Sequence, residues 1–144
     1  MLIGEYVHSI DAKKRLSIPA KFRHEIGKRA VLTRGLDKSL FLYSLDEWKK
    51  IAEKLSKLPA GQASTRGFVR LMLAGALDVE IDSLGRILVP DYLKEYASIG
   101  ESAVITGVYN RLEIWDERIW NDYKGRVEKE ATDIAEKLGE VGAF

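Results

Sequence analysis

The chain has 144 residues, enough for one domain of ordinary size or two very small ones. Its 23 Lys and Arg nearly balance its 22 Asp and Glu, and the net charge of +1 excludes a uniformly basic, histone-like protein. The absence of Cys excludes disulfide scaffolds, zinc–thiolate sites and Cys nucleophiles, and two His are too few for a three-His metal site. No uncharged run is long enough to span a bilayer and the start is unlike a signal peptide, so we expect a soluble cytoplasmic protein that needs no cofactor.

The strongest feature of the sequence is an internal repeat. The run Ile-Asp-Ala-Lys-Lys-Arg-Leu-Ser-Ile-Pro at 10–19 recurs, 71 residues later, as Ile-Asp-Ser-Leu-Gly-Arg-Ile-Leu-Val-Pro at 81–90. Further matches in the same order pair residues 30–33 with 103–106, and Trp48 with Trp120. A unit of about 45 residues is too small to bury a sufficient core alone. We therefore expect the two copies to complete one another's sheet in a pseudo-twofold body.

Both copies predict the same order of elements. The first begins with a strand in which Tyr6, His8 and Ile10 alternate with Glu5, Val7 and Ser9, and a short loop leads to a strand over 16–18. Pro19 then opens a short helix that Gly27 ends. Two more strands follow, over 30–33 and 40–43. The second copy predicts strands over 77–81, 87–89, 103–107 and 112–115, with a short helix between Pro90 and Gly100.

Three further helices are predicted outside the repeated strands. Ser44 and Glu47 form a capping box before a helix with one apolar stripe. The stripe consists of Trp48, Ile51, Leu55 and Leu58. A second connecting helix, over about 63–74, brings together Phe68, Leu71 and Met72. Asp116 can cap a C-terminal helix whose stripe is expected to face the core or a subunit interface. That stripe consists of Ile119, Tyr123, Val127, Ile134 and Leu138.

These elements divide the chain into four segments. We expect the first repeat over 5–47, a helical connector over 48–75, the second repeat over 76–119 and the C-terminal helix over 120–144.

Each repeat carries an Asp-x-x-x-Arg motif around its first loop, Asp11 with Arg15 and Asp82 with Arg86. In a three-residue hairpin loop the last position is commonly left-handed, which Gly85 allows without strain. Lys14 stands at the equivalent position of the first loop, where a left-handed conformation costs about 1 kcal/mol. The Asp and Arg then lie across the strand ends and can pair. Taken alone, the motif is compatible with a surface ion pair that stabilises the turn.

The two motifs and their flanks, residues 4–23 and 82–90, resemble the repeats of the MraZ family of bacterial transcriptional regulators. The resemblance covers about residues 1–140. It implies a mainly β fold with peripheral helices, in which two AbrB-like swapped-hairpin repeats form one pseudo-twofold β-barrel. It also implies a ring-shaped homo-oligomer in the nucleoid that binds direct repeats in double-stranded DNA upstream of its own cell-wall and division gene cluster. Lys14 departs from the family's usual Gly, which predicts a loop of different shape or one ordered only by phosphate contact.

The resemblance and the side-chain chemistry together indicate which residues contact DNA. A two-stranded ribbon fits the major groove, an Arg fork suits guanine O6 and N7, and a Lys serves as a point charge for phosphate. We therefore expect Arg15 to contact a base or a phosphate and Asp11 to orient it. Phosphate contacts are expected from Lys13, Lys14, Lys21 and Arg23. The second hairpin lacks the adjacent lysines, so Arg86, oriented by Asp82, is equally consistent with DNA contact and with a structural or subunit contact.

Two other functions are alternatives to DNA binding. A hydrolase could use Asp11 or Asp82 with His8, but no nucleophile elbow, phosphate loop or metal-ligand motif accompanies them, and His8 is better explained as a core histidine. No enzyme and no small-molecule substrate are therefore expected. An oligomeric scaffold or antitoxin-like protein-binding module is the remaining alternative, although the tail after the last helix is too short for a toxin-binding segment.

The near-neutral net charge conceals a polarised chain. Residues 1–38 hold nine Lys or Arg and four Asp or Glu, whereas residues 113–144 hold five and nine. Positive charge thus gathers around the first hairpin and negative charge on the last helix, which predicts a basic rim that could face DNA.

Overall fold

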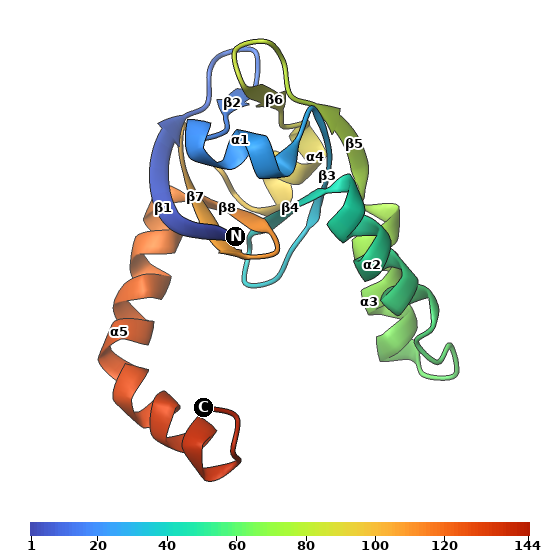
Figure 1. Cartoon of the computed structure of the whole chain (residues 1–144), viewed down its shortest axis with the longest axis vertical. Helices are drawn as coiled ribbons and strands as arrows, with labels where there is room; N and C mark the ends of the chain where they lie inside the picture. Colours follow the sequence, from blue (N-terminus) through green and yellow to red (C-terminus); the bar gives the residue numbers. More distant parts are fainter.

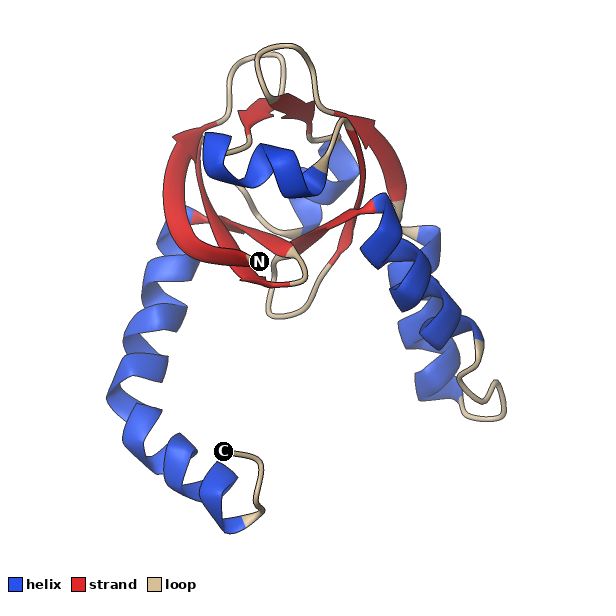
Figure 2. Ribbon diagram, viewed as in Figure 1, coloured by secondary structure: helices blue, strands red, loops and turns tan.

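The computed structural model describes residues 1–144 and shows a mainly β body with helices at its periphery (Figures 1 and 2). The strands are β1 (Leu2–Ser9), β2 (Arg15–Ser17), β3 (Arg29–Arg34), β4 (Leu40–Ser44), β5 (Leu77–Glu80), β6 (Arg86–Leu88), β7 (Ser102–Tyr109) and β8 (Leu112–Asp116). The helices are α1 (Ala20–Ile26), α2 (Leu45–Ser56), α3 (Ala63–Ala74), α4 (Asp91–Tyr96) and α5 (Glu117–Glu140). None of the helices is long and apolar enough to cross a membrane.

The strands of the two repeats are exchanged. The six-stranded sheet has the order β1-β7-β8-β4-β3-β5, and β2 pairs with β6 in a separate two-stranded sheet. In the two repeats β1 is equivalent to β5, β2 to β6, β3 to β7 and β4 to β8. If each strand of the large sheet is replaced by its equivalent, the same strand order results, read in the opposite direction. The expected pseudo-twofold relation is therefore confirmed. β1 of the first repeat pairs with β7 of the second, and β5 of the second pairs with β3 of the first. The repeats therefore form one body, and the large sheet curls around its centre (Figure 2).

One apolar core fills the space enclosed by the strands. Its 20 buried residues come from both repeats, with equivalent pairs such as Leu16 with Ile87 and Phe22 with Leu93. β4 is buried on both faces, because Leu40 and Leu42 point into this core while Phe41 and Tyr43 join a smaller cluster with Leu55 of α2. Burial of apolar surface from both repeats is what stabilises the exchanged pairing.

The short helices α1 and α4 follow Pro19 and Pro90, as predicted. Gly27 ends α1 with a φ of 84°, which confirms its expected role. Gly100 does not end α4, which stops at Tyr96, and the left-handed residue after it is Ser98 with a φ of 52°. The prediction that Gly100 ends the helix is wrong, because Ser98 adopts the left-handed conformation two residues earlier and the chain turns there.

β1 is more exposed than its alternation predicts. Leu2 and Ile10 are buried on the inward phase, but Tyr6 is 38% exposed and His8 is half-buried without a hydrogen bond. The expectation of a satisfied core histidine is therefore wrong. The reason is that β1 is an edge strand paired on one side only, with β7.

The α2–α3 hairpin packs on the outer face of β4. The Ser44 hydroxyl accepts the N–H of Glu47 at 3.3 Å, but the Glu47 carboxylate binds Lys50 instead of returning to the cap, so only half of the predicted capping box forms. Trp48, Ile51 and Leu55 cover the small cluster, whereas Leu58 lies beyond the helix and is 42% exposed. From α3 the cluster takes Phe68, Met72 and Leu73 rather than the expected Leu71.

The long helix α5 is fixed to the body only at its start. The Asp116 carboxylate accepts the N–H groups of Arg118 and Ile119, as predicted for an N-cap. The Glu5 carboxylate of β1 accepts a hydrogen bond from Trp120 at 2.6 Å and forms an ion pair with Lys124 at 2.8 Å. No residue of α5 is buried, and the helix projects away from the β body on the side opposite the α2–α3 hairpin (Figure 1).

We expect two glycine-to-alanine substitutions to have opposite effects. At Gly107 an added Cβ would lie 2.6 Å from the backbone of Leu2 and Ile3, so Gly107→Ala should lower the free energy of unfolding by about 1–3 kcal/mol. At Gly125 within α5 nothing lies within 4 Å of the added atom, so Gly125→Ala should raise stability by about 0.5–1 kcal/mol. Urea unfolding followed by circular dichroism measures both, and equal effects would contradict the close approach of β1 to β7.

Candidate nucleic-acid interface

The two Asp-x-x-x-Arg motifs meet on the two-stranded sheet of β2 and β6, which we call the β2–β6 ribbon. Its register places Arg15 opposite Leu88, Leu16 opposite Ile87, and Ser17 opposite Arg86. Leu16 and Ile87 point into the core and are buried. Since side chains alternate along a strand, the outer face of the ribbon carries the other four residues. These are Arg15, Ser17, Arg86 and Leu88.

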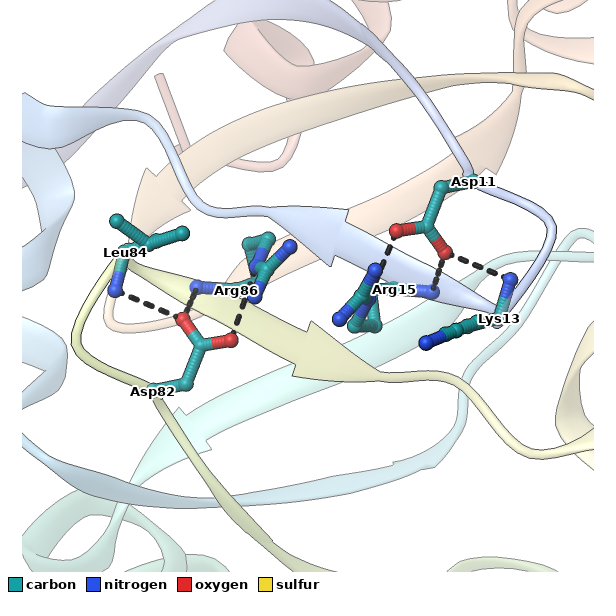
Figure 3. A network of polar contacts seen from close by, with 6 residues as sticks. All are labelled: Asp11, Lys13, Arg15, Asp82, Leu84 and Arg86. Carbon is teal, nitrogen blue, oxygen red and sulfur yellow. Dashed lines mark hydrogen bonds and ion pairs between the residues drawn. The ribbon is translucent and has the colours of Figure 1, made fainter.

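Each Asp organises its own loop through the same set of hydrogen bonds (Figure 3). One carboxylate oxygen of Asp11 accepts the N–H groups of Lys13 and Arg15, both at 2.9 Å, and the other accepts Arg15 Nε at 2.8 Å. Asp82 repeats this pattern with the N–H groups of Leu84 and Arg86 and with Arg86 Nε. The expected orienting role of both Asp residues is thus matched by direct contacts to their Arg partners.

The two arginines lie on the same side of the ribbon, between the two loops (Figure 3). Their side chains are 33% exposed for Arg15 and 25% exposed for Arg86. Because Nε is bound to Asp in each case, the two terminal nitrogens are the donors left for a ligand, and neither pair is hydrogen-bonded within the chain. Two terminal guanidinium nitrogens form the fork that binds a planar pair of acceptors.

The first loop has the same shape as the second despite Lys14. Lys14 has a φ of 64° and Gly85 a φ of 80°, so both adopt the left-handed conformation at the last loop position. The expectation of a differently shaped loop at Lys14 is therefore wrong. The hydrogen bonds that close the loop on Asp11 and Arg15 outweigh the small backbone strain of a left-handed Lys.

Each loop is also held by the opposite repeat. The carbonyl of Gly85 accepts the N–H of Ile18 at 2.8 Å, and the carbonyl of Lys14 accepts the N–H of Val89 at 2.9 Å. The Arg23 guanidinium packs over Gly85, where any Cβ would lie 2.1 Å from its atoms, and Arg23 Nε donates to the carbonyl of Ile18 at 2.8 Å. The hairpins are consequently fixed relative to one another before any ligand arrives.

The structure distributes the predicted cations unevenly around the ribbon. Lys13 is exposed and makes no ion pair. Lys14 is bound to Asp91 at 2.6 Å, at the start of α4. Lys21 lies over the rings of Tyr6 and Phe22, 5.6 Å and 5.5 Å from their centroids. Arg23 is half-buried in the contact with the second hairpin, so only part of its guanidinium remains for a phosphate.

Sequence reasoning missed three residues at this surface. Leu88 and Ser17 share the outer face with the arginines, and Asp91 faces Lys14. The period-two alternation around Arg15 and Arg86 could have found Leu88 and Ser17, because residues two apart on a strand share a face. Asp91 could not be found in this way, since it comes from the other repeat.

The geometry offers little to the hydrolase alternative. The carboxylates of Asp11 and Asp82 are engaged by loop N–H groups and by arginine, and neither makes a hydrogen bond to His8. Hydrogen bonds from the loop N–H of Arg15 and of Arg86 are the largest cause that lowers the pKa of Asp11 and of Asp82, respectively. A carboxylate with a lowered pKa is a weaker general base.

We expect the contribution of Asp11 to disappear in acid. Its folded pKa lies below the ordinary value of 3.8, so its charge stabilises the folded hairpin above about pH 3.8, and this stabilisation is lost as the pH falls through the lowered pKa. Wild type should therefore melt at a higher temperature than Asp11→Asn at pH 7, and the two should converge below pH 3.8. Thermal melts by circular dichroism between pH 7 and 3 measure this. Asp133→Asn on α5 is the control, and a constant gap between wild type and Asp11→Asn would contradict the assignment.

The whole chain is similar to known proteins. The family model described as "MraZ protein, putative antitoxin-like" matches it twice, over residues 1–71 and 72–139. A protein named Transcriptional regulator MraZ from Caldanaerobacter subterraneus subsp. tengcongensis is 49% identical over 138 residues, which are 96% of each chain. Proteins of the same name from Thermoanaerobacter pseudethanolicus and Thermoanaerobacter sp. strain X514 are 50% and 48% identical, over 98% of this chain and 99% of theirs. Two matches that together span both exchanged repeats, and near-complete relatives at these identities, show that the chain belongs to the MraZ family.

Proposed function

We propose that this protein is a transcriptional regulator that binds double-stranded DNA sequence-specifically through the β2–β6 ribbon. One observation carries the proposal: Arg15 and Arg86 stand side by side on the outer face, each with Nε held by an Asp and its terminal fork free. A two-stranded ribbon has the width of the major groove, and an Arg fork matches guanine O6 and N7. The names of the curated relatives agree with this function.

The surrounding cations have a separate role in the proposal. Lys13 is exposed at the loop tip and is the leading phosphate contact, and Lys21 on α1 is a second candidate that lies over the ring of Tyr6. Lys14 must exchange its exposed ion pair with Asp91 for a phosphate, which costs little because surface pairs are weak. Phosphate contacts of this kind supply affinity and register but no base preference.

The distribution of charge over the fold supports the orientation of the complex. The hairpin loops lie at one end of the molecule, and α2, α3 and α5 extend toward the other (Figure 1). The acidic C-terminal segment is therefore held away from the basic first hairpin, so its repulsion of a phosphate backbone at the ribbon is small.

Self-assembly is supported by the apolar stripe of α5. The start of α5 is equivalent to the start of α2, with Trp120 packed on Trp115 as Trp48 is packed on Tyr43. α3 covers the apolar face of α2, but no helix of the chain covers the corresponding face of α5, where Val127, Ile134 and Leu138 are 37–42% exposed. We propose that a second copy covers this stripe in a ring-shaped homo-oligomer. Several ribbons in one assembly would then bind several direct repeats at once, and the assembly would bind more tightly than a single ribbon does.

Binding to DNA upstream of the protein's own gene tests the proposal. Arg15→Ala should weaken binding by about 1–3 kcal/mol, roughly 5- to 150-fold, because it removes the fork and leaves the core untouched. Lys13→Ala should weaken binding to all sequences alike and reduce the slope of log K against log salt by about 0.9 for each lost phosphate contact. Fluorescence anisotropy over a salt series, with gel shifts, measures both effects.

Lys129→Ala is the matched control, because Lys129 is an exposed lysine on α5. Circular dichroism and solution mass must show that each variant keeps its fold and assembly. An Arg15→Ala protein that is folded and binds the same DNA as tightly as wild type would refute Arg15 as a DNA contact.

A second copy on α5 can be tested with one charge. Ile134→Asp places a carboxylate in the exposed stripe and should shift the solution mass toward a smaller species, because a buried unpaired charge is costly. Thr132→Asp introduces the same charge on the opposite face of the helix and should leave the mass unchanged. Light scattering coupled to size exclusion measures the mass. If wild type is already a monomer, the assembly is refuted and the stripe instead favours the antitoxin-like, protein-binding alternative.

A further inference from the structure

The outer face of the β2–β6 ribbon carries a leucine where a polar surface would be expected. Leu88 is 54% exposed, and Leu84 at the tip of the second loop is 63% exposed. The equivalent positions of the first repeat hold Ser17 and Lys13. The pseudo-twofold backbone is thus combined with two different surfaces, one cationic and one apolar.

Leu88 lies directly beside the leading DNA contact. It is the cross-strand partner of Arg15, and side chains of such a pair leave the same face of a sheet with Cβ atoms about 5 Å apart. Arg15 is held in place by Asp11, so its fork and Leu88 keep a constant relation. If the fork binds a guanine, Leu88 faces the adjacent base pair, because stacked base pairs follow one another at a similar spacing.

The chemistry of the major groove leaves one good partner for a leucine there. The recognition groups that the bases present in that groove are hydrogen-bond donors and acceptors together with the 5-methyl group of thymine, which is the only methyl group among them and projects farther than the C5–H of cytosine. A leucine pressed against a polar edge would desolvate it without replacing its hydrogen bonds, which is unfavourable. The methyl group also projects into the groove, within reach of a side chain shorter than arginine.

We propose that Leu88 is a specificity-determining residue that contacts a thymine methyl group in the base pair next to the guanine bound by Arg15. The inference rests on the proposed function and adds a second element to its recognition. Arg86 has Ser17 opposite it and therefore lacks an apolar neighbour of this kind. The ribbon then recognises a site with a direction, although its backbone is nearly twofold symmetric. A directional unit suits direct repeats rather than inverted ones.

The experiment removes the methyl group from the DNA and the leucine from the protein. A duplex selected by the wild-type protein from a random pool is made with each thymine in turn replaced by deoxyuridine. For wild type, one replacement adjacent to a guanine should weaken binding about fourfold, the value of one buried methyl-sized group of about 0.8 kcal/mol. Leu88→Ala should bind the thymine and the uracil duplexes equally, because the contact is already absent. Replacements at other thymines of the same duplex serve as controls.

The equivalent position supplies a gain-of-function variant. Ser17→Leu places a leucine opposite Arg86 and should create a second methyl-sensitive thymine, on the other side of the site. Both substitutions lie on the outer face of the ribbon, and solution mass and circular dichroism verify that each variant remains assembled and folded.

The outcomes distinguish the Leu88 contact from the proposed binding of DNA by the ribbon. If Arg15→Ala weakens binding as expected but no thymine-to-uracil replacement affects wild type, Leu88 is not a base contact and DNA binding by the ribbon still stands. If Leu88→Ala keeps the full methyl dependence, another residue contacts the thymine and the inference fails. If Leu88→Ala changes the solution mass and leaves the methyl dependence intact, the leucine belongs to a subunit contact. If Arg15→Ala binds as wild type does, the proposed function itself fails.

Discussion

The exchange of strands between the two repeats is the constraint on which the rest of the structure depends. β1 pairs with β7, β5 with β3, and β2 with β6, so every outer strand of one repeat finds its partner in the other. A single repeat would leave those strands without partners and its half of the core open to water. A unit of this size buries too little apolar surface to offset the unpaired backbone groups and the exposed core. The ribbon that carries both arginines therefore exists only because the repeats are interlocked.

The same exchange makes the ribbon rigid. The carbonyls of Lys14 and Gly85 each accept an N–H from the opposite repeat, and the loops are closed internally by Asp11 and Asp82. Rigid placement of two forks lowers the entropy lost on binding, which is the physical advantage of building a DNA contact on strands rather than on a mobile loop. With the backbone determined by these bonds, the outward side chains are free to differ between repeats, as Leu88 and Ser17 do.

Much of this fold follows from local rules that act within a few residues. Proline at the start of α1, the Asp116 cap and the Asp–Arg pairing across a three-residue loop depend on neighbours in the chain, and each prediction is confirmed. The errors have one local cause and two that involve segments distant in the chain. Ser98 rather than Gly100 reverses the chain after α4, and His8 is only half-buried because β1 has a partner on one side alone. Lys14 keeps a left-handed backbone because the hydrogen bonds within its own loop are joined by contacts with the opposite repeat.

The sequence by itself determined that the protein is a duplicated, mainly β chain with an Asp–Arg hairpin in each half, since repetition, alternation and turn chemistry are recorded in residue order. Only the tertiary structure decided that the two hairpins form one ribbon, that Arg23 is engaged with the second loop, and that Leu88 lies opposite Arg15. These relations join residues far apart in the chain, and they are set by which register buries Leu16 and Ile87 together in the core.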